Sequence, residues 1–181
     1  RTGIFAAAIW ERLQDDPEAI EGFQKLYPYF HLYLENSESV KASLEAIADA
    51  HDLGKLAFSP HEIFNPIRAI FQKNIVCHLL DPELRYGEFE HSIMRFHPLL
   101  SAILATMWGM SASFTLPIMQ HHEKSNGSGY YKLQEEDISF FSFILSAADI
   151  IDAKGFDNMR MYMHPEAVAA IKESNYGDAR R

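Results

Sequence analysis

The sequence has almost no cysteine, no long apolar run and no excess of positive charge. Cys77 is its one cysteine, which excludes an internal disulfide framework and any zinc module built on several cysteines. No run of about 18 apolar residues is present to cross a bilayer. With 16 Lys and Arg against 25 Asp and Glu, the net charge of −9 disfavours a surface that grips nucleic acid or acidic lipid. We therefore expect no membrane contact and no large nucleic-acid partner.

The composition that remains is that of a folded protein. The 181 residues are 48% hydrophobic and 23% charged, and their number suits one domain rather than two large ones. We predict a single domain over residues 1–181. The lone cysteine is compatible with a reducing compartment, so a cytoplasmic location is expected.

Apolar residues recur at three- and four-residue steps along most of the chain, which predicts amphipathic helices. No segment shows the period-two alternation of strands, so the predicted fold class is all-α. The near-continuous apolar content of residues 99–110 predicts a buried helix, and Pro117 is expected to begin the next one. The other main helices are predicted at residues 4–13, at 18–35 with a break at Pro28, from 38 into His51-Asp52, and at 138–153.

Nine histidines are the unusual feature of the composition. His51 and Asp52 stand at the end of a predicted helix, where a carboxylate can bridge two cations while the imidazole binds one of them. Taken alone, the pair is weak evidence for a metal site, and a surface helix end is the simpler interpretation.

Further ligand types occur at other predicted helices. His97, His121, His122 and Asp149 each stand in apolar sequence. Apolar neighbours predict that Asp149 is buried, and a buried carboxylate needs a metal, an Arg or a helix cap as its partner. Four imidazoles and two carboxylates suit a binuclear site of Fe or Mn, with Zn as an alternative. Two such ions can activate a hydroxide and clamp a phosphoryl group.

In this order, the motifs resemble those of the HD-GYP branch of the HD-domain metal phosphohydrolases. The resemblance runs from about residue 38 onward, and residues 66–80 look like an insertion. The matching stretches are His51-Asp52-Leu53-Gly54-Lys55, His97-Pro98, His121-His122-Glu123 with Gly127, Gly129 and Tyr130, and Ala148-Asp149-Ile150-Ile151-Asp152-Ala153.

Arg1-Thr2-Gly3 also resembles the residues that follow the first metal-ligand histidine of this family. We therefore expect the chain to be a fragment, with that histidine upstream of Arg1. An upstream regulatory domain and a homodimer are compatible with the resemblance.

The resemblance implies an HD-domain helical bundle with its metal site between core helices. It implies two divalent ions, or three as in some members, and assigns Asp52 as their bridge and Lys55 as the contact to the scissile phosphate. Substrate contacts are implied for Gly129, Tyr130 and Arg160. The implied metal ligands are His51, Asp52, His97, His121, His122 and Asp149.

Two positions depart from the family pattern. Tyr131 stands where proline is usual, and Asn126 stands where aspartate is usual. Loss of the proline frees the backbone at Tyr131, so we expect a looser loop or an altered substrate choice.

The implied activity is hydrolysis of cyclic di-GMP to linear pGpG, to GMP or to both, by a metal-bridging hydroxide with Asp52 and Lys55 as catalytic residues. Two alternatives stay open. One is an HD-type phosphohydrolase acting on another nucleotide or cyclic dinucleotide. The other is a catalytically silent module that binds a cyclic dinucleotide and signals.

Overall fold

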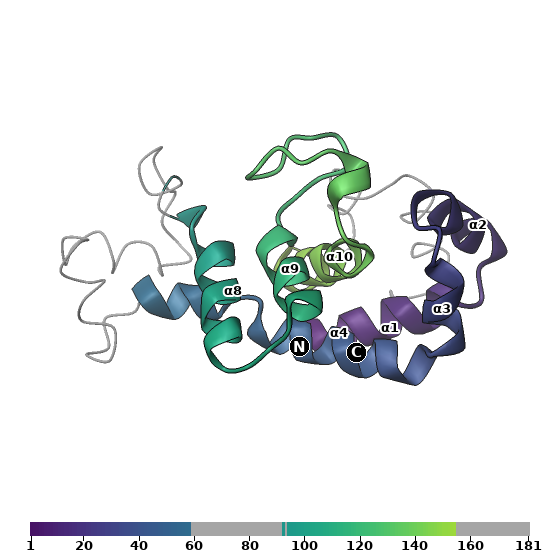
Figure 1. Ribbon diagram of the computed structural model, residues 1–181, viewed down its shortest axis with the longest axis horizontal. Helices are drawn as coiled ribbons and strands as arrows, with labels where there is room; N and C mark the ends of the chain where they lie inside the picture. Colours follow the sequence, from purple (N-terminus) through teal and green to yellow (C-terminus); the bar gives the residue numbers. More distant parts are fainter. Residues whose placement is uncertain (59–91, 93, 155–181) are drawn as a thin grey trace. The chain divides into compact units, whose positions relative to one another are not determined.

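The computed structural model of the chain describes residues 1–58, 92 and 94–154 (Figure 1). These residues are helical and include no strand, which confirms the all-α prediction. The predicted insertion at residues 66–80 lies outside the described part. The described elements are α1 (Thr2–Leu13), α2 (Pro17–Leu26), α3 (Phe30–Glu35), α4 (Ser37–Ala50), the 3-10 helix η1 (Leu53–Phe58), α8 (His97–Met107), α9 (Ala112–Gln120), the 3-10 helix η3 (Glu135–Asp137) and α10 (Phe140–Lys154).

The chain divides into two compact units. Unit 1 comprises Arg1–Asp49 and Gln120–Arg181, and unit 2 comprises Ala50–Met119. The chain therefore enters unit 2 at Ala50, one residue before His51, and returns to unit 1 at Gln120, one residue before His121. No described helix is both long and apolar enough to cross a membrane.

Unit 1 is built around the packing of α1 against α10, the purple and the yellow-green helix of Figure 1. Trp10 is fully buried at the centre of this core, with its ring centroid 6.2 Å from that of Phe30 and 5.7 Å from that of Phe140, both edge-on. Its indole Nε1 donates to the backbone oxygen and the hydroxyl of Ser37, at 3.2 and 3.1 Å. A buried Trp thus keeps its one polar atom bonded while its ring joins α1, α3 and α10.

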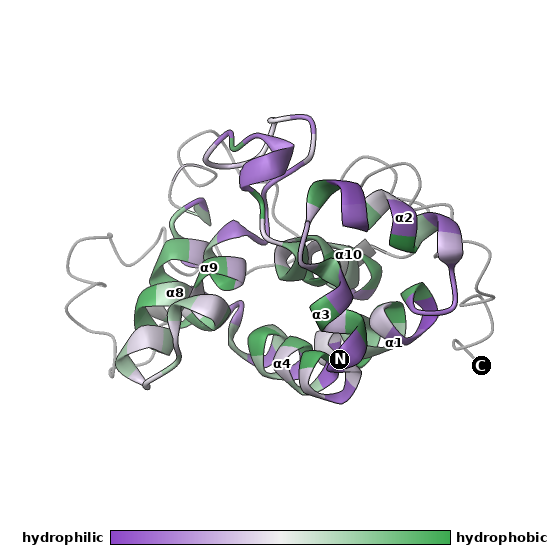
Figure 2. Cartoon of the chain, turned by 45° about the vertical axis from the view of Figure 1, so that its right-hand side comes forward, coloured by the Kyte–Doolittle hydropathy of each residue, from purple (hydrophilic) through white to green (hydrophobic). Residues whose placement is uncertain are grey.

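Local signals explain where α2 begins and ends. The Asp16 carboxylate caps the helix by accepting from the amides of Glu18 and Ala19, both at 3.0 Å, and Pro17 occupies the first turn. The helix ends at Leu26, two residues before Pro28, and α3 begins at Phe30, so the predicted break is confirmed. The ribbon of α2 alternates between green and purple in Figure 2, as expected for an amphipathic helix.

In unit 2, η1 packs against α8. The ribbon of α8 is mostly green in Figure 2, yet the prediction that residues 99–110 are buried is wrong for one face of this helix. Leu99, Ile103 and Met107, spaced four residues apart, are 37%, 46% and 75% exposed. The buried face consists of smaller residues, among them Ala102 and Ala105. A run that is apolar on every side does not reveal which side is covered.

The predicted start of the next helix is also wrong. Pro117 lies inside α9 rather than at its beginning, because α9 starts at Ala112. Proline inside a helix removes one backbone hydrogen bond and crowds the preceding turn. The helix continues past Pro117 to Gln120, so the surrounding structure offsets that cost.

Candidate metal centre

His51 is the first residue after α4, as the sequence predicted, and Asp52 follows it. His51 is 6% exposed, whereas Asp52 is only partly covered. The chain then turns directly into η1, which carries Lys55. The end of α4 therefore brings an imidazole, a carboxylate and an ammonium group together within five residues. An ordinary surface helix end needs no such cluster and no buried histidine.

Asp52 is the shared partner of three basic side chains of unit 2. Its Oδ1 lies 3.2 Å from His97 Nε2, and its Oδ2 lies 3.4 Å from His51 Nε2 and 2.6 Å from Lys55 Nζ. One carboxylate thus faces two imidazoles through different oxygens. This is the geometry in which a carboxylate can contribute to two cations at once.

The surroundings of Asp52 favour its ionised form. Burial acts to raise the pKa of this carboxyl, but the hydrogen bond with His97 and the positive charges of His51 and Lys55 lower it more. The net result is a pKa well below the ordinary value of an aspartate. Asp52 is therefore a carboxylate at any pH where a histidine is neutral enough to bind a metal.

His97 begins α8 and is 1% exposed. Its Nδ1 lies 2.7 Å from the backbone oxygen of Met94, and since a carbonyl can only accept, Nδ1 carries the hydrogen. In a neutral ring, Nε2 then has a lone pair directed toward Asp52 Oδ1. Two electron-rich atoms at 3.2 Å need a proton or a metal ion to hold them together. A backbone carbonyl that orients the imidazole is also the usual outer partner of a metal-bound histidine.

A close backbone approach holds η1 against α8 at this point. The amide of Gly54 donates to the hydroxyl of the buried Ser101 at 2.7 Å. A Cβ on Gly54 would lie 2.1 Å from the backbone oxygen of His97 and 2.7 Å from the amide nitrogen of Ser101. Only glycine fits between these backbone atoms, and the contact connects the Asp52 segment to the residue that carries the second imidazole.

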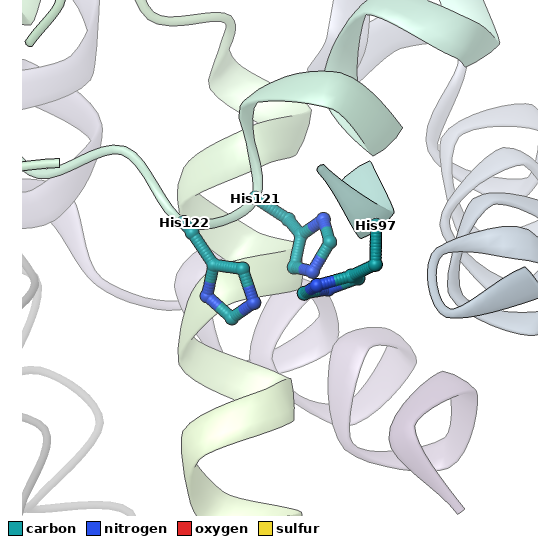
Figure 3. A group of neighbouring side chains, drawn as sticks. All are labelled: His97, His121 and His122. Atoms are coloured by element: carbon teal, nitrogen blue, oxygen red, sulfur yellow. The ribbon is translucent and has the colours of Figure 1, made fainter. Parts of the chain in front are cut away.

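Unit 1 contains two adjacent imidazoles that follow α9. His121 is fully buried and His122 is partly covered, with their ring centroids 4.1 Å apart (Figure 3). The preceding residue, Gln120, is buried and anchors this end of α9. Its side chain donates to the backbone oxygen of Asp137 at 3.0 Å and accepts from the amide of Ser139 at 2.9 Å. Figure 3 also labels His97, the imidazole of unit 2 described above.

The other predicted functional residues differ in how far they are buried and in whether the structure describes them. Asp149 lies within α10 between the buried residues Ala148 and Ile150 and is itself partly covered. On a helix, one position in such a run faces outward even when its neighbours are covered. Lys55 is 37% exposed and contacts Asp52. Arg160 lies outside the described residues.

The loop after His122 depends on Glu123, which the sequence analysis named within a motif but to which it assigned no role. Glu123 is 2% exposed, and its carboxylate accepts from the amide of Tyr131 at 2.8 Å and from that of Leu133 at 2.9 Å. The amide of Tyr131, which a proline would lack, is therefore hydrogen-bonded to a buried carboxylate. The sequence carried no signal for this role, because the burial of an acidic residue within a polar stretch is visible only in the structure.

The other departure, Asn126, also makes local bonds. Its Oδ1 accepts from the amide of Ser128 at 3.0 Å and from the Ser128 hydroxyl at 2.6 Å. Gly127 follows it with a φ of 70°, in the left-handed region. An aspartate oxygen makes the same turn, so asparagine preserves this part of the loop.

Buried imidazoles together with the Asp52 carboxylate are groups that could hold a metal ion. Unit 2 provides His51, Asp52 and His97, and unit 1 provides His121 and His122. Nitrogen and carboxylate donors without sulfur fit Fe, Mn or Zn. Family models, curated proteins and solved structures were each compared with the chain, and none matched. The assignment of the ligands thus depends on the motifs and on the geometry within each unit.

Acidification is expected to release a bound metal. Protons compete for imidazole nitrogens near pH 6.5, whereas Asp52 stays ionised because its pKa is lowered. We expect the affinity for Mn²⁺ to fall at least about tenfold between pH 7.5 and about pH 5.5 as the imidazoles are protonated. Equilibrium dialysis of the purified protein measures this, and an affinity that is constant over the interval would show that histidines are not ligands.

Proposed function

We propose that this chain is a metal-dependent phosphodiesterase of the HD-GYP type that hydrolyses cyclic di-GMP to pGpG, GMP or both. The observation that carries the proposal is the position of Asp52, which faces His51 and His97 through different oxygens. A carboxylate that presents one oxygen to each of two imidazoles could bridge two metal ions bound by them. The order of the motifs along the sequence supplies the family.

The proposed ligands are His51, Asp52, His97, His121, His122 and Asp149. Divalent ions bound by them would supply a strongly acidified water and charge stabilisation at phosphorus. The chain's own contribution begins with Asp52, whose lowered pKa keeps it ready to bind cations. The backbone carbonyl of Met94 orients the imidazole of His97. It accepts from Nδ1 and so directs Nε2 toward Asp52.

Lys55 is the proposed contact to the scissile phosphate. Its ammonium is 2.6 Å from Asp52 Oδ2 and 37% exposed, so it is held beside the ligands while it remains accessible to a substrate. An ammonium placed there stabilises the charge that grows on the phosphate oxygens during attack. Tyr130, whose ring centroid is 4.6 Å from that of His122, is the aromatic side chain proposed to contact the dinucleotide.

The test is metal analysis and turnover on the full-length protein. We expect about two Fe or Mn ions per chain, cleavage of cyclic di-GMP that a chelator abolishes, and recovery on adding Mn²⁺. Little cleavage of mononucleotide substrates is expected. A protein that binds these metals but cleaves no cyclic dinucleotide would refute the enzymatic proposal.

Two other functions give distinct results in the same assays. Preferred cleavage of a mononucleotide would assign the chain to the wider HD-type phosphohydrolases. Tight binding of cyclic di-GMP without cleavage would assign it to silent signalling modules, an alternative kept open by Tyr131 in the usual place of proline.

A further inference from the structure

The amides of the loop after His122 converge on one buried side chain. Glu123 Oε1 accepts from Tyr131, and Glu123 Oε2 accepts from Leu133. Lys132, between them, has a φ of 59°, in the left-handed region that non-glycine residues seldom adopt. A left-handed residue turns the amides on either side toward a common point, where an anion can accept from both. The internal anion here is the Glu123 carboxylate.

The loop also lies directly on Glu123. A Cβ on Gly129 would be 2.5 Å from the Cα and 2.7 Å from the Cδ of Glu123. Gly129 is buried, so a side chain there could not turn toward solvent without moving the loop. Contact with Glu123 therefore accounts for the glycine at this position.

These contacts surround Tyr130 in the sequence. Gly129 packs on Glu123 and Tyr131 donates to Glu123, so the backbone on both sides of Tyr130 is held by the same residue. The Tyr130 ring then lies next to the imidazole of His122, the residue that precedes Glu123. Glu123 thus determines where Tyr130 stands relative to a proposed metal ligand.

We propose that Glu123 is a positioning residue that fixes Tyr130 for binding of the cyclic dinucleotide, an inference that rests on the proposed function. It acts through two backbone amides and touches neither the metal nor the substrate. The amide of Tyr131 is an essential part of this device. A proline at position 131, although usual in the family that the sequence resembles, would remove a donor and leave one oxygen of a buried carboxylate without its partner.

The experiment compares Glu123→Gln and Tyr131→Pro with two controls in the full-length protein. Tyr131→Phe keeps the amide, and Glu136→Gln makes the same charge change at an exposed site. We expect Glu123→Gln to speed amide exchange at Tyr131 or Leu133 about tenfold or more, because one N–H loses its acceptor. Tyr131→Pro should do the same at Leu133. In both controls, the amides of residues 131 and 133 should exchange at the wild-type rate.

Kinetics provide the functional readout. Both test variants should raise the KM for cyclic di-GMP about tenfold, with kcat changed less than about threefold and with wild-type metal content. Unchanged exchange, an unchanged KM or a loss of metal would each overturn the positioning role. If Glu123→Gln does not fold, Tyr131→Pro alone decides, because it leaves the carboxylate in place. A wild-type protein that neither binds nor cleaves cyclic di-GMP would refute the proposed function itself, while the exchange data would still show whether Glu123 orders the loop.

Discussion

Replacing Asp52 by asparagine is expected to reduce the proposed metal-dependent activity more than any other single substitution at the site. Asparagine keeps the size of the side chain but removes the charge that faces His51, His97 and Lys55. A neutral amide cannot bridge two divalent cations. We expect kcat/KM for cyclic di-GMP to fall about a thousandfold, because several kcal/mol of charge stabilisation by the metals is lost.

Metal content and turnover of Asp52→Asn should be measured together, with Asp49→Asn as the matched control. Asp49 lies one turn earlier on the chain and is exposed, so its variant should bind metal and turn over normally. Metal-free Asp52→Asn should also melt at a lower temperature than the metal-free wild type at pH 7. The lowered pKa of Asp52 means that its ionised form stabilises the fold above the ordinary pKa of about 4, and that this contribution is lost as the pH falls below it. Full metal occupancy in the variant would contradict the bridging role.

Replacing Gly54 by alanine is expected to disrupt the site through packing alone. The new Cβ would lie 2.1 Å from the backbone oxygen of His97, where no flexible side chain can move aside. Either η1 or α8 must shift, and the shift changes the distance between Asp52 and His97. We expect a loss of about 3 kcal/mol of stability, which lowers the melting temperature by roughly 6–12 °C in a chain of this size.

Gly3→Ala is the control for this substitution. Gly3 lies in α1, and a Cβ there would meet its nearest neighbours at 3.6 Å, an ordinary contact. Alanine in a helix interior should leave stability unchanged or raise it slightly. Thermal melts followed by circular dichroism, together with metal titrations, separate the two variants. Wild-type stability and metal affinity in Gly54→Ala would show that η1 and α8 do not approach as closely as described.

Features that depend on near neighbours in the chain were predicted well from the sequence. The spacing of apolar residues predicted helices and no strands, and Pro28 predicted the break between α2 and α3. The helix predicted to run from residue 38 into His51-Asp52 is α4, which ends at Ala50. Helical periodicity, proline geometry and capping are all local, so a single sequence is enough to read them.

Features that depend on what packs against a residue were predicted poorly. The apolar run at residues 99–110 did not reveal that one face of α8 is exposed. Pro117 was predicted to begin a helix because proline inside a helix costs a backbone hydrogen bond. The contacts that offset this cost inside α9 cannot be read from the neighbouring residues. Tyr131 was interpreted only as the absence of a rigid proline. The sequence did not show that its amide is bonded to a residue eight positions away.

The sequence by itself determined the helical fold class and the identities of the candidate ligands, because periodicity and donor chemistry are properties of the residues. Only the tertiary structure decided how those residues are used. It placed Asp52 between two imidazoles, required glycine at position 54 and made Glu123 the acceptor for the loop. Each of these depends on distances between side chains and backbone atoms, which packing and loop conformation set and residue types alone do not.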